Sequence, residues 1–187
     1  MLIVFEGIDG CGKETQIKLL KGKLGCEVFK YPTAGNKALN DYLEKKTAPD
    51  PKALFLTFLS DIAEDQRNVK KALDLGKTVV LDRYVFSTIA YEVDGIDYPR
   101  GKKIVEGVGY LKPDVVLLLD IDSRTSQERK RKQKKLDRYE ENSAYLDMVR
   151  VNFLHLRDDM FLSRWVTIDA TKSVDEVHKM IMKALGK

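Results

Sequence analysis

Short apolar runs alternate with longer amphipathic segments along the whole chain. The runs are rich in β-branched residues and nearly continuous, which is typical of strands in a parallel sheet that is covered on both faces. Because strand-like and helix-like segments alternate, we expect an α/β fold with three layers, in which right-handed crossovers place helices on both faces of a five-stranded parallel sheet. The predicted strands are Leu2–Glu6, Glu27–Lys30, Thr78–Asp82, Val115–Asp120 and Val166–Asp169.

The segment Pro51–Leu75 has the pattern of an amphipathic helix. Asp50 and Pro51 suit its N-cap and first helical position, and Gly76 suits its far end. Ser173 and Glu176 form a capping-box pattern for a last helix. In folds of this class, ligands bind at the carboxyl ends of the strands, which is where the chemical motifs fall. The apolar residues at helical spacing after Pro51 are Leu54, Phe55, Phe58, Leu59 and Ile62.

Length and composition predict one domain, residues 1–187. Apolar residues make up 43% and charged residues 33%, which is typical of a soluble globular protein and not of a disordered one. Two cysteines, Cys11 and Cys26, cannot form a disulfide framework, so we expect a reducing compartment, the cytoplasm. The first apolar run lacks a basic leader and predicts a strand, not a signal peptide, and no apolar stretch approaches bilayer length. We expect no membrane contact.

Positive charge is concentrated in one segment. The formal net charge is only +4, but residues 124–138 hold eight basic and two acidic side chains. Such a run is typical of a nucleic-acid patch, of a solvated helix face or of a site for a small anion. Because it has no interleaved aromatic residues, we favour a local anionic ligand and expect no nucleic-acid partner.

The segment Gly7–Lys13 matches the pattern G-x-x-x-x-G-K between a predicted strand and a predicted helix. Glycines permit positive φ, so that backbone N–H groups turn towards one point; the helix N-terminus adds partial positive charge and Lys13 adds a full one. The pattern predicts a site for the phosphates of ATP. Its residues would be Gly7, Ile8, Asp9, Gly10, Cys11, Gly12, Lys13, Glu14 and Thr15.

Glu14 stands where this pattern usually has a hydroxyl residue that binds Mg²⁺. Magnesium prefers oxygen ligands, so the Glu14 carboxylate would bind it directly or through water; without a metal between them, it would repel the phosphates. Asp82, at the end of a predicted strand, offers a second carboxylate. We predict Mg²⁺ as the cofactor, with Glu14 and Asp82 as its ligands.

Further motifs follow in a fixed order. They are Asp82-Arg83-Tyr84 with Ser87 and Ala90-Tyr91, Pro113-Asp114 before the run 115–120, Leu136-Asp137-Arg138-Tyr139-Glu140, and Ile168-Asp169-Ala170. Together with Phe5-Glu6-Gly7-Ile8-Asp9-Gly10, they make the chain resemble the thymidylate kinase family from residue 2 to about 177. The resemblance implies a P-loop kinase fold with a lid at about 123–141, a homodimer, and transfer of the ATP γ-phosphate to dTMP.

The acceptor side centres on Arg83, which at a strand end is able to grip a phosphate through two parallel hydrogen bonds. The resemblance implies that Asp9 contacts the acceptor sugar or the metal. It also places Ser87, Tyr91 and the Tyr31 of Lys30-Tyr31-Pro32-Thr33 at the acceptor site. Phe58 suits an aromatic face for the base, although its spacing suits a core residue equally well.

Two positions depart from the family pattern. Ala34 replaces the arginine expected two residues after Pro32, and Ile62 replaces the arginine that contacts the pyrimidine. Gln66 or Arg67, one turn along, is a candidate for the missing donor. We expect dTMP to remain preferred, and dUMP and dCMP to be accepted more readily than is usual for the family.

Lid arginines would stabilise the charge that phosphoryl transfer spreads over the equatorial oxygens, and a closed lid would exclude water. The family takes its catalytic arginine either from the position of Gly10 or from the lid, and Gly10 cannot serve. The candidates are Arg129, Arg131 and Arg138, of which Arg138 fits the motif best. Lys13, Arg83 and Asp9 complete the predicted catalytic set.

The sequence thus favours ATP-dependent phosphorylation of dTMP to dTDP in nucleotide biosynthesis. Three alternatives remain: a kinase for another acceptor such as UMP, dUMP or a deoxynucleoside, a regulatory nucleotide-binding module without catalysis, and a nucleic-acid-binding protein. Glu14 is the feature that favours the second, and the basic run is the feature that favours the third.

Overall fold

Five parallel strands form one sheet in the order β2-β3-β1-β4-β5. The computed structural model describes residues 1–91, 95–131 and 142–187. The strands are β1 (Leu2–Glu6), β2 (Glu27–Lys30), β3 (Val79–Asp82), β4 (Val115–Asp120) and β5 (Trp165–Asp169). The predicted α/β fold is confirmed. Three strands have the predicted bounds, whereas β3 begins one residue later and β5 one residue earlier than expected.

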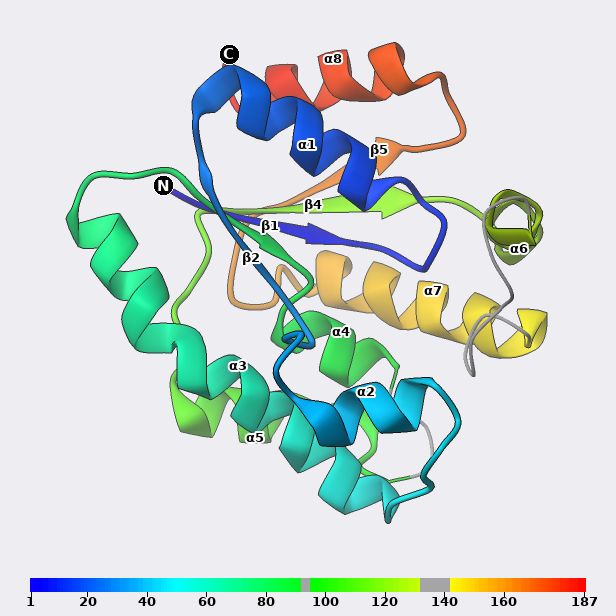
Figure 1. The fold of residues 1–187 in the computed structure, drawn as a ribbon. Helices are drawn as coiled ribbons and strands as arrows, with labels where there is room; N and C mark the ends of the chain where they lie inside the picture. The colour runs from blue at the N-terminus through cyan, green and yellow to red at the C-terminus, as the bar shows by residue number, and fades with distance from the viewer. Residues whose placement is uncertain (92–94, 132–141) are drawn as a thin grey trace.

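Helices cover both faces of the sheet, as Figure 1 shows. Helices α1 and α8 lie over one face, and α3, α4, α5 and α7 lie over the other. Helix α2 lies beside α3, and α6 lies beyond the carboxyl end of β4. Within the described residues, the bounds are α1 Lys13–Leu24, α2 Lys37–Leu43, α3 Pro51–Asp74, α4 Val85–Ala90, α5 Tyr98–Val108, α6 Ser123–Arg131, α7 Ser143–Asp158 and α8 Val174–Ala184.

The predicted start and end residues of α3 and the predicted capping box of α8 are present in the structure. The Asp50 side chain accepts hydrogen bonds from the backbone N–H groups of Lys52 and Ala53 at 3.0 and 3.2 Å. This N-cap satisfies two donors that a helix leaves unpaired at its start. Gly76, with φ 75°, follows the last turn of α3. Ser173 and Glu176 form the reciprocal capping box of α8.

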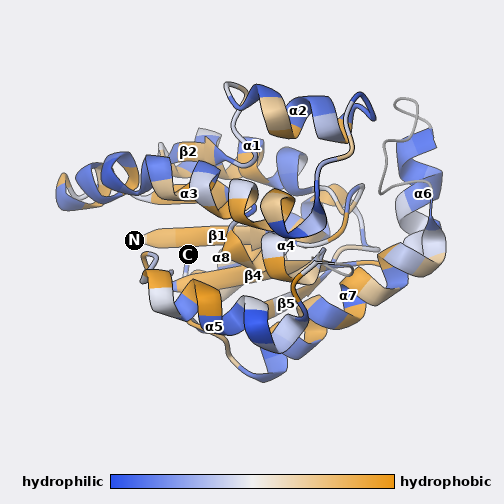
Figure 2. Cartoon of the chain, turned by 90° about the horizontal axis from the view of Figure 1, so that it is seen from below, coloured by the Kyte–Doolittle hydropathy of each residue, from blue (hydrophilic) through white to orange (hydrophobic). Residues whose placement is uncertain are grey.

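The core consists of the sheet and the apolar helix faces that pack on it. Strands β1 and β3 are buried throughout, and β4 is buried up to Leu119. Figure 2 shows the hydrophobic strands enclosed between helices, whereas α6 is largely hydrophilic. Among the described residues, no helix has the length and apolar character needed to cross a bilayer.

The sheet order places the start of the phosphate loop at the centre of the sheet. Strand β1 lies between β3 and β4. The chain leaves β1 through α1 towards β2 at one edge of the sheet, and it leaves β3 through α4 and α5 in the opposite direction, towards β4. Such a switch point in an open α/β sheet leaves a crevice at the carboxyl ends of the strands. Residues 7–12 and Arg83 both follow strands at this edge, so the fold brings the loop and Arg83 together.

Candidate active site

The phosphate loop curls around the side chain of Lys13. Gly7, Gly10 and Gly12 have φ values of 136°, 76° and 98°, which residues with a side chain rarely adopt. A Cβ on Gly7 would lie 2.4 Å from the carbonyl oxygen of Leu119, so this glycine is also required by close packing. The Lys13 Nζ donates to the carbonyl oxygens of Gly7 and Ile8 at 2.8 and 3.3 Å. The loop therefore surrounds a fixed cation at the N-terminus of α1.

Helix α6 packs directly against this loop. A Cβ on Gly10 would lie 2.8 Å from the Ser126 carbonyl oxygen and 3.2 Å from Cγ of Lys130. The buried Ser126 hydroxyl donates to the carbonyl oxygen of Asp9. Gly10 thus has no room for a side chain, which gives a packing reason why no arginine can be accommodated there in this arrangement.

Arg83 lies immediately after β3 in a strained backbone conformation. Its φ of 70° is in the left-handed region, which costs a non-glycine residue about 1–2 kcal/mol. The guanidinium donates to the Asp9 carboxylate at 2.8 Å and to the Ser87 hydroxyl at 2.9 Å. Longer contacts reach the Gly7 carbonyl oxygen at 3.4 Å and the Tyr91 hydroxyl at 3.5 Å. This strained residue therefore connects the phosphate loop to α4.

The Asp9–Arg83 pair is stable in its ionised form. Burial alone would raise the pKa of Asp9, but Arg83, Lys13 and Lys130 outweigh it and hold the pKa well below its usual range. The Tyr91 hydroxyl donates to the second Asp9 oxygen at 3.2 Å. The sequence analysis assigns Asp9 to the acceptor sugar or the metal and Arg83 to the acceptor phosphate, whereas the structure shows the two side chains bound to each other.

Glu6 lies beneath this pair and is completely buried. Its carboxylate accepts from the backbone N–H of Tyr84 at 2.8 Å, from the backbone N–H of Ser87 at 3.2 Å and from the Ser87 hydroxyl at 2.6 Å. Burial raises the pKa of Glu6 to about 7, although Arg83, Ser87, Lys13 and the Tyr84 N–H oppose the shift. Glu6 therefore anchors the first turn of α4 and carries a charge that changes near neutral pH.

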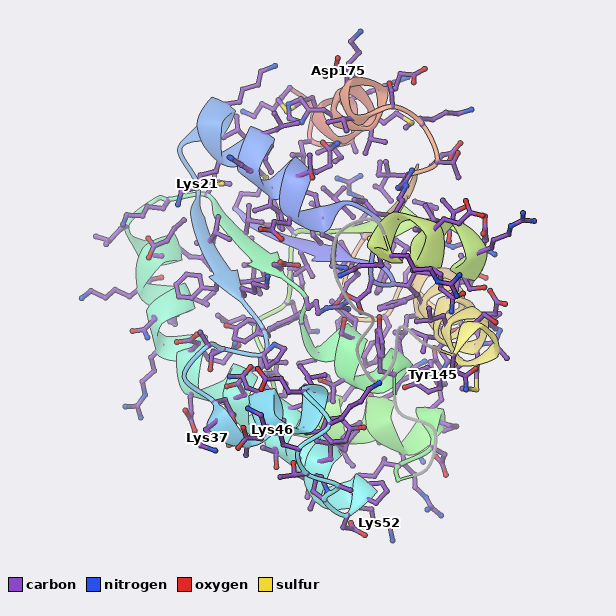
Figure 3. The ribbon with its side chains drawn as sticks, turned by 45° about the vertical axis from the view of Figure 1, so that its right-hand side comes forward. Lys21, Lys37, Lys46, Lys52, Tyr145 and Asp175 are labelled. Atoms are coloured by element: carbon purple, nitrogen blue, oxygen red, sulfur yellow. The ribbon has the colours of Figure 1, made fainter. Side chains whose placement is uncertain are left out.

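Helix α7 supports the end of α4. Tyr145, labelled in Figure 3, donates its hydroxyl to the backbone carbonyl of Tyr91. Asn152 donates to the carbonyl of Ala90 at 3.0 Å. The Tyr91 ring also packs edge-on against Phe153. These contacts fix the Tyr91 ring beside Arg83, whose guanidinium carbon lies 5.2 Å from the ring centroid.

A cavity opens beside Arg83, and all six predicted acceptor residues line it. Asp9, Arg83, Ser87 and Tyr91 supply charged and hydroxyl groups, and α2 and α3 supply mainly apolar side chains. Phe58 is only half-buried and lines the cavity, so it is not one of the fully buried core residues. The lining residues are Asp9, Lys30, Tyr31, Pro32, Leu43, Leu54, Phe58, Ile62, Arg83, Tyr84, Ser87, Thr88 and Tyr91.

The cavity has an apolar wall where the family pattern has an arginine. Ile62 is 2% exposed and lines the cavity. Gln66 is committed elsewhere, since its Oε1 accepts from the Tyr84 hydroxyl and the Leu111 N–H, both at 3.0 Å. Arg67 is exposed and lies outside the lining. In this arrangement neither Gln66 nor Arg67 presents a donor to the cavity, so their role as the missing donor stays a prediction.

Several lining residues were not predicted from the sequence. Lys30, Pro32 and Tyr84 belong to quoted motifs, so proximity to a predicted site residue was a usable signal. Leu43, Leu54 and Thr88 carry no such signal in the sequence, because they also fit ordinary apolar or helical positions. Tyr31 was predicted, but its hydroxyl is buried and has no hydrogen-bond partner among the described residues.

The predicted metal ligands are not part of a preformed metal site. Glu14 is exposed in the first turn of α1, and Asp82 is buried at the end of β3. The described residues include no group of three or more His, Cys, Asp or Glu side chains that could hold a metal ion. Two oxygen donors suit Mg²⁺ only where substrate phosphates and water complete its coordination.

The described part of the predicted lid ends at Arg131. Arg129 donates to the backbone carbonyl of Ala170 at 2.9 Å, which links α6 to the segment after β5. Arg131 is exposed. Arg138 and the motif at 136–140 lie outside the described residues. No contact of Arg129 or Arg131 tests a catalytic role, so the predicted roles of all three arginines stay predictions.

Comparison with known proteins agrees with this architecture. The family model described as thymidylate kinase matches residues 5–181. A probable thymidylate kinase of Methanocaldococcus jannaschii is 39% identical over 97% of this chain and 94% of its own length. The thymidylate kinase of Homo sapiens is 33% identical over 96% of this chain and 87% of its own length.

Two solved structures share the fold. A thymidylate kinase from Candida albicans superposes with a TM-score of 0.81 at 26% identity, covering 99% of this chain and 90% of that chain. A deoxyadenosine kinase from M. mycoides has a TM-score of 0.76 at 22% identity, covering 100% and 99%, and supports the fold alone. With the family model matching nearly the whole length, the chain belongs to the thymidylate kinase family.

Proposed function

We propose that this protein transfers the γ-phosphate of ATP to the 5′-phosphate of dTMP, forming ADP and dTDP. One observation carries the proposal: the Arg83 guanidinium contacts both the phosphate loop, at Gly7 and Asp9, and a cavity lined by predicted acceptor residues. A phosphate in the cavity would therefore lie next to a phosphate in the loop. The relatives named thymidylate kinase support dTMP as the acceptor.

The loop and Lys13 would bind the ATP phosphates. Backbone N–H groups at the N-terminus of α1 and the Lys13 ammonium provide positive charge at one point. Glu14 and Asp82 would hold Mg²⁺ together with the phosphates and water. A bound Mg²⁺ would neutralise charge on the donor phosphates and polarise the bond to the transferred group.

The cavity would bind the acceptor nucleotide. Arg83 would orient its phosphate, the Phe58 and Tyr91 rings would contact the base and sugar, and Tyr31 would lie against them. Arg83 must exchange some of its present partners for phosphate oxygens. Its two longest contacts, to Gly7 and Tyr91, are the easiest to replace.

Transfer would form a bond from an acceptor phosphate oxygen to Pγ and break the bond from Pγ to the oxygen that bridges it to Pβ. The acceptor oxygen is already anionic, so no general base is needed. Positioning and charge stabilisation then account for most of the catalysis. We propose Arg129, Arg131 and Arg138 as sources of lid charge; Arg129 would first have to leave the Ala170 carbonyl.

We also propose a homodimer that acts in the cytoplasm in nucleotide biosynthesis, without a nucleic-acid partner. The resemblance to the family supports the dimer, and the two buried free cysteines suit a reducing compartment.

The test is ATP turnover with a panel of acceptors: dTMP, dUMP, UMP, dCMP and thymidine. We expect dTMP to give the highest kcat/KM and thymidine to give no product. Preference for UMP or thymidine would replace the proposed acceptor. ATP binding without turnover of any acceptor would instead favour a regulatory module.

A further inference from the structure

Arg83 is already engaged by the protein. Its two terminal nitrogens carry four N–H groups, and the structure provides four acceptors for them: the Gly7 carbonyl, the Ser87 hydroxyl, the Asp9 carboxylate and the Tyr91 hydroxyl. Asp9 also neutralises the guanidinium charge. A phosphate dianion that reaches the cavity would therefore meet an arginine whose charge is already paired with Asp9 and whose donors must first be released from their present partners.

Lys30 is the second cation that lines the cavity. It is the last residue of β2 and pairs in register with Asp82, the residue directly before Arg83. Its side chain is 65% exposed, and its Nζ lies 3.8 Å from the Asp82 carboxylate, which is beyond hydrogen-bond length. Within residues 1–91, 95–131 and 142–187 no acceptor lies within hydrogen-bond length of this ammonium group, so its donors are available to a ligand in the cavity.

Three other lysines in this part of the molecule are bound elsewhere. Lys13 donates to the Gly7 and Ile8 carbonyls of the phosphate loop. Lys37 and Lys46, labelled in Figure 3 beside α2, both pair with Asp41 and do not line the cavity. Asp9, Lys30 and Arg83 are the lining residues with full charges, so two cations and one carboxylate give a net charge of +1 that depends on Lys30.

We propose that Lys30 binds the acceptor's 5′-phosphate together with Arg83 and so makes the cavity select a nucleoside monophosphate over the free nucleoside. The proposal rests on the function proposed above and assigns a residue to it. When the phosphate arrives, the Lys30 ammonium moves from Asp82 to the phosphate oxygens. Arg83 then keeps its pair with Asp9 and supplies orientation, while Lys30 supplies the charge.

The experiment compares native protein with Lys30→Met, Lys30→Arg and Lys77→Met by calorimetric binding of dTMP and of thymidine. Methionine keeps the stem length of lysine without its charge. Lys77 is an exposed lysine paired with Glu27 outside the cavity, and it controls for loss of a surface charge. Melting temperatures check that each variant is folded.

We expect Lys30→Met to weaken dTMP binding by about 10- to 100-fold, the effect of one charge-assisted hydrogen bond, and to change thymidine binding less than about twofold. Lys30→Arg should recover most of the affinity, and Lys77→Met should bind dTMP like the native protein. Equal dTMP affinity in native protein and Lys30→Met, or an equal loss for dTMP and thymidine, would overturn the role of Lys30. Failure of native protein to phosphorylate dTMP would instead overturn the proposed function.

Discussion

The phosphate loop takes its shape from seven consecutive residues, whereas the acceptor cavity is assembled from side chains on widely separated segments. In the loop, the site is formed by backbone conformation and one buried lysine. Neighbouring atoms leave no room for a side chain at Gly7 or Gly10. In the cavity, the buried Ile62 stands where the family pattern has an arginine. We therefore expect the loop to determine the rate of phosphate transfer and the cavity to select the acceptor.

The largest effect should come from the loop. Lys13→Ala removes its ammonium group, and kcat should fall by roughly a thousandfold, because in the proposed function this buried charge would face the donor phosphates. Relative kcat/KM values for dTMP, dUMP and dCMP should stay the same, since the cavity is intact. Lys18→Ala, an exposed lysine on α1, is the matched control.

Steady-state kinetics with all three acceptors measures both quantities. If Lys13→Ala changed the acceptor preference as strongly as the rate, the loop and cavity would not have the separate roles described.

Glu6 lies beneath both regions, and its titration should make stability depend on pH. The pKa of Glu6 rises from 4.5 in the unfolded chain to about 7 in the folded protein. Between these values the folded protein holds a proton that the unfolded chain releases, so this residue's contribution to stability is lost as pH rises through the window. The shift corresponds to about 3 kcal/mol.

Glu6→Gln is neutral at every pH and should lack this decline. Urea unfolding of both proteins from pH 4.5 to 8 measures it. Glu27→Gln, an exposed carboxylate on β2, should keep the native pH dependence. Parallel stability curves for native protein and Glu6→Gln would show that Glu6 does not titrate in this range.

Ile62→Arg should sharpen the cavity's choice of base. A buried donor that finds no partner rejects a ligand far more strongly than a missing methyl contact does. We expect native protein to separate dTMP from dUMP by about 10- to 200-fold and to exclude dCMP by less than 10⁴-fold. Ile62→Arg should increase the exclusion of dCMP by at least about tenfold, with kcat/KM for each nucleotide as the measurement.

Ile62→Leu keeps an apolar side chain of similar volume and controls for repacking. Exclusion of dCMP by four or more orders of magnitude in native protein would mean that a polar group other than residue 62 already distinguishes the bases.

The smallest effect should separate two glycines of the loop. Gly10 and Gly12 both have positive φ, so alanine strains the backbone at either site. Only the Gly10 Cβ would meet α6, whereas the Gly12 Cβ would meet nothing within 4 Å. Gly10→Ala should therefore lower the free energy of unfolding by roughly 1–2 kcal/mol more than Gly12→Ala in urea titrations. Equal losses would show that α6 does not rest on Gly10.

The contrast between a contiguous loop and a cavity assembled from distant segments also explains which features the sequence could predict. The sheet and the loop follow from local signals: apolar runs that match the strands within one residue, and glycines and a lysine at fixed spacing. The cavity depends on residues such as Leu43, Leu54 and Thr88, which become neighbours only after the crossovers have formed. The Asp9–Arg83 pair joins side chains 74 positions apart, and no local pattern distinguishes such a pair from two separate ligand contacts.

Asp9 belongs to both regions. Its backbone carbonyl accepts the hydroxyl of Ser126 on α6, and its carboxylate accepts from Arg83 and Tyr91 in the cavity. A nucleotide that moved this residue from one side would therefore also change its contacts on the other side. By linkage, the first nucleotide to bind alters the affinity for the second by the same factor in either order. Any cooperativity between the two substrates would thus be transmitted in part through one aspartate, and so would any preference for dead-end complexes of mismatched nucleotides.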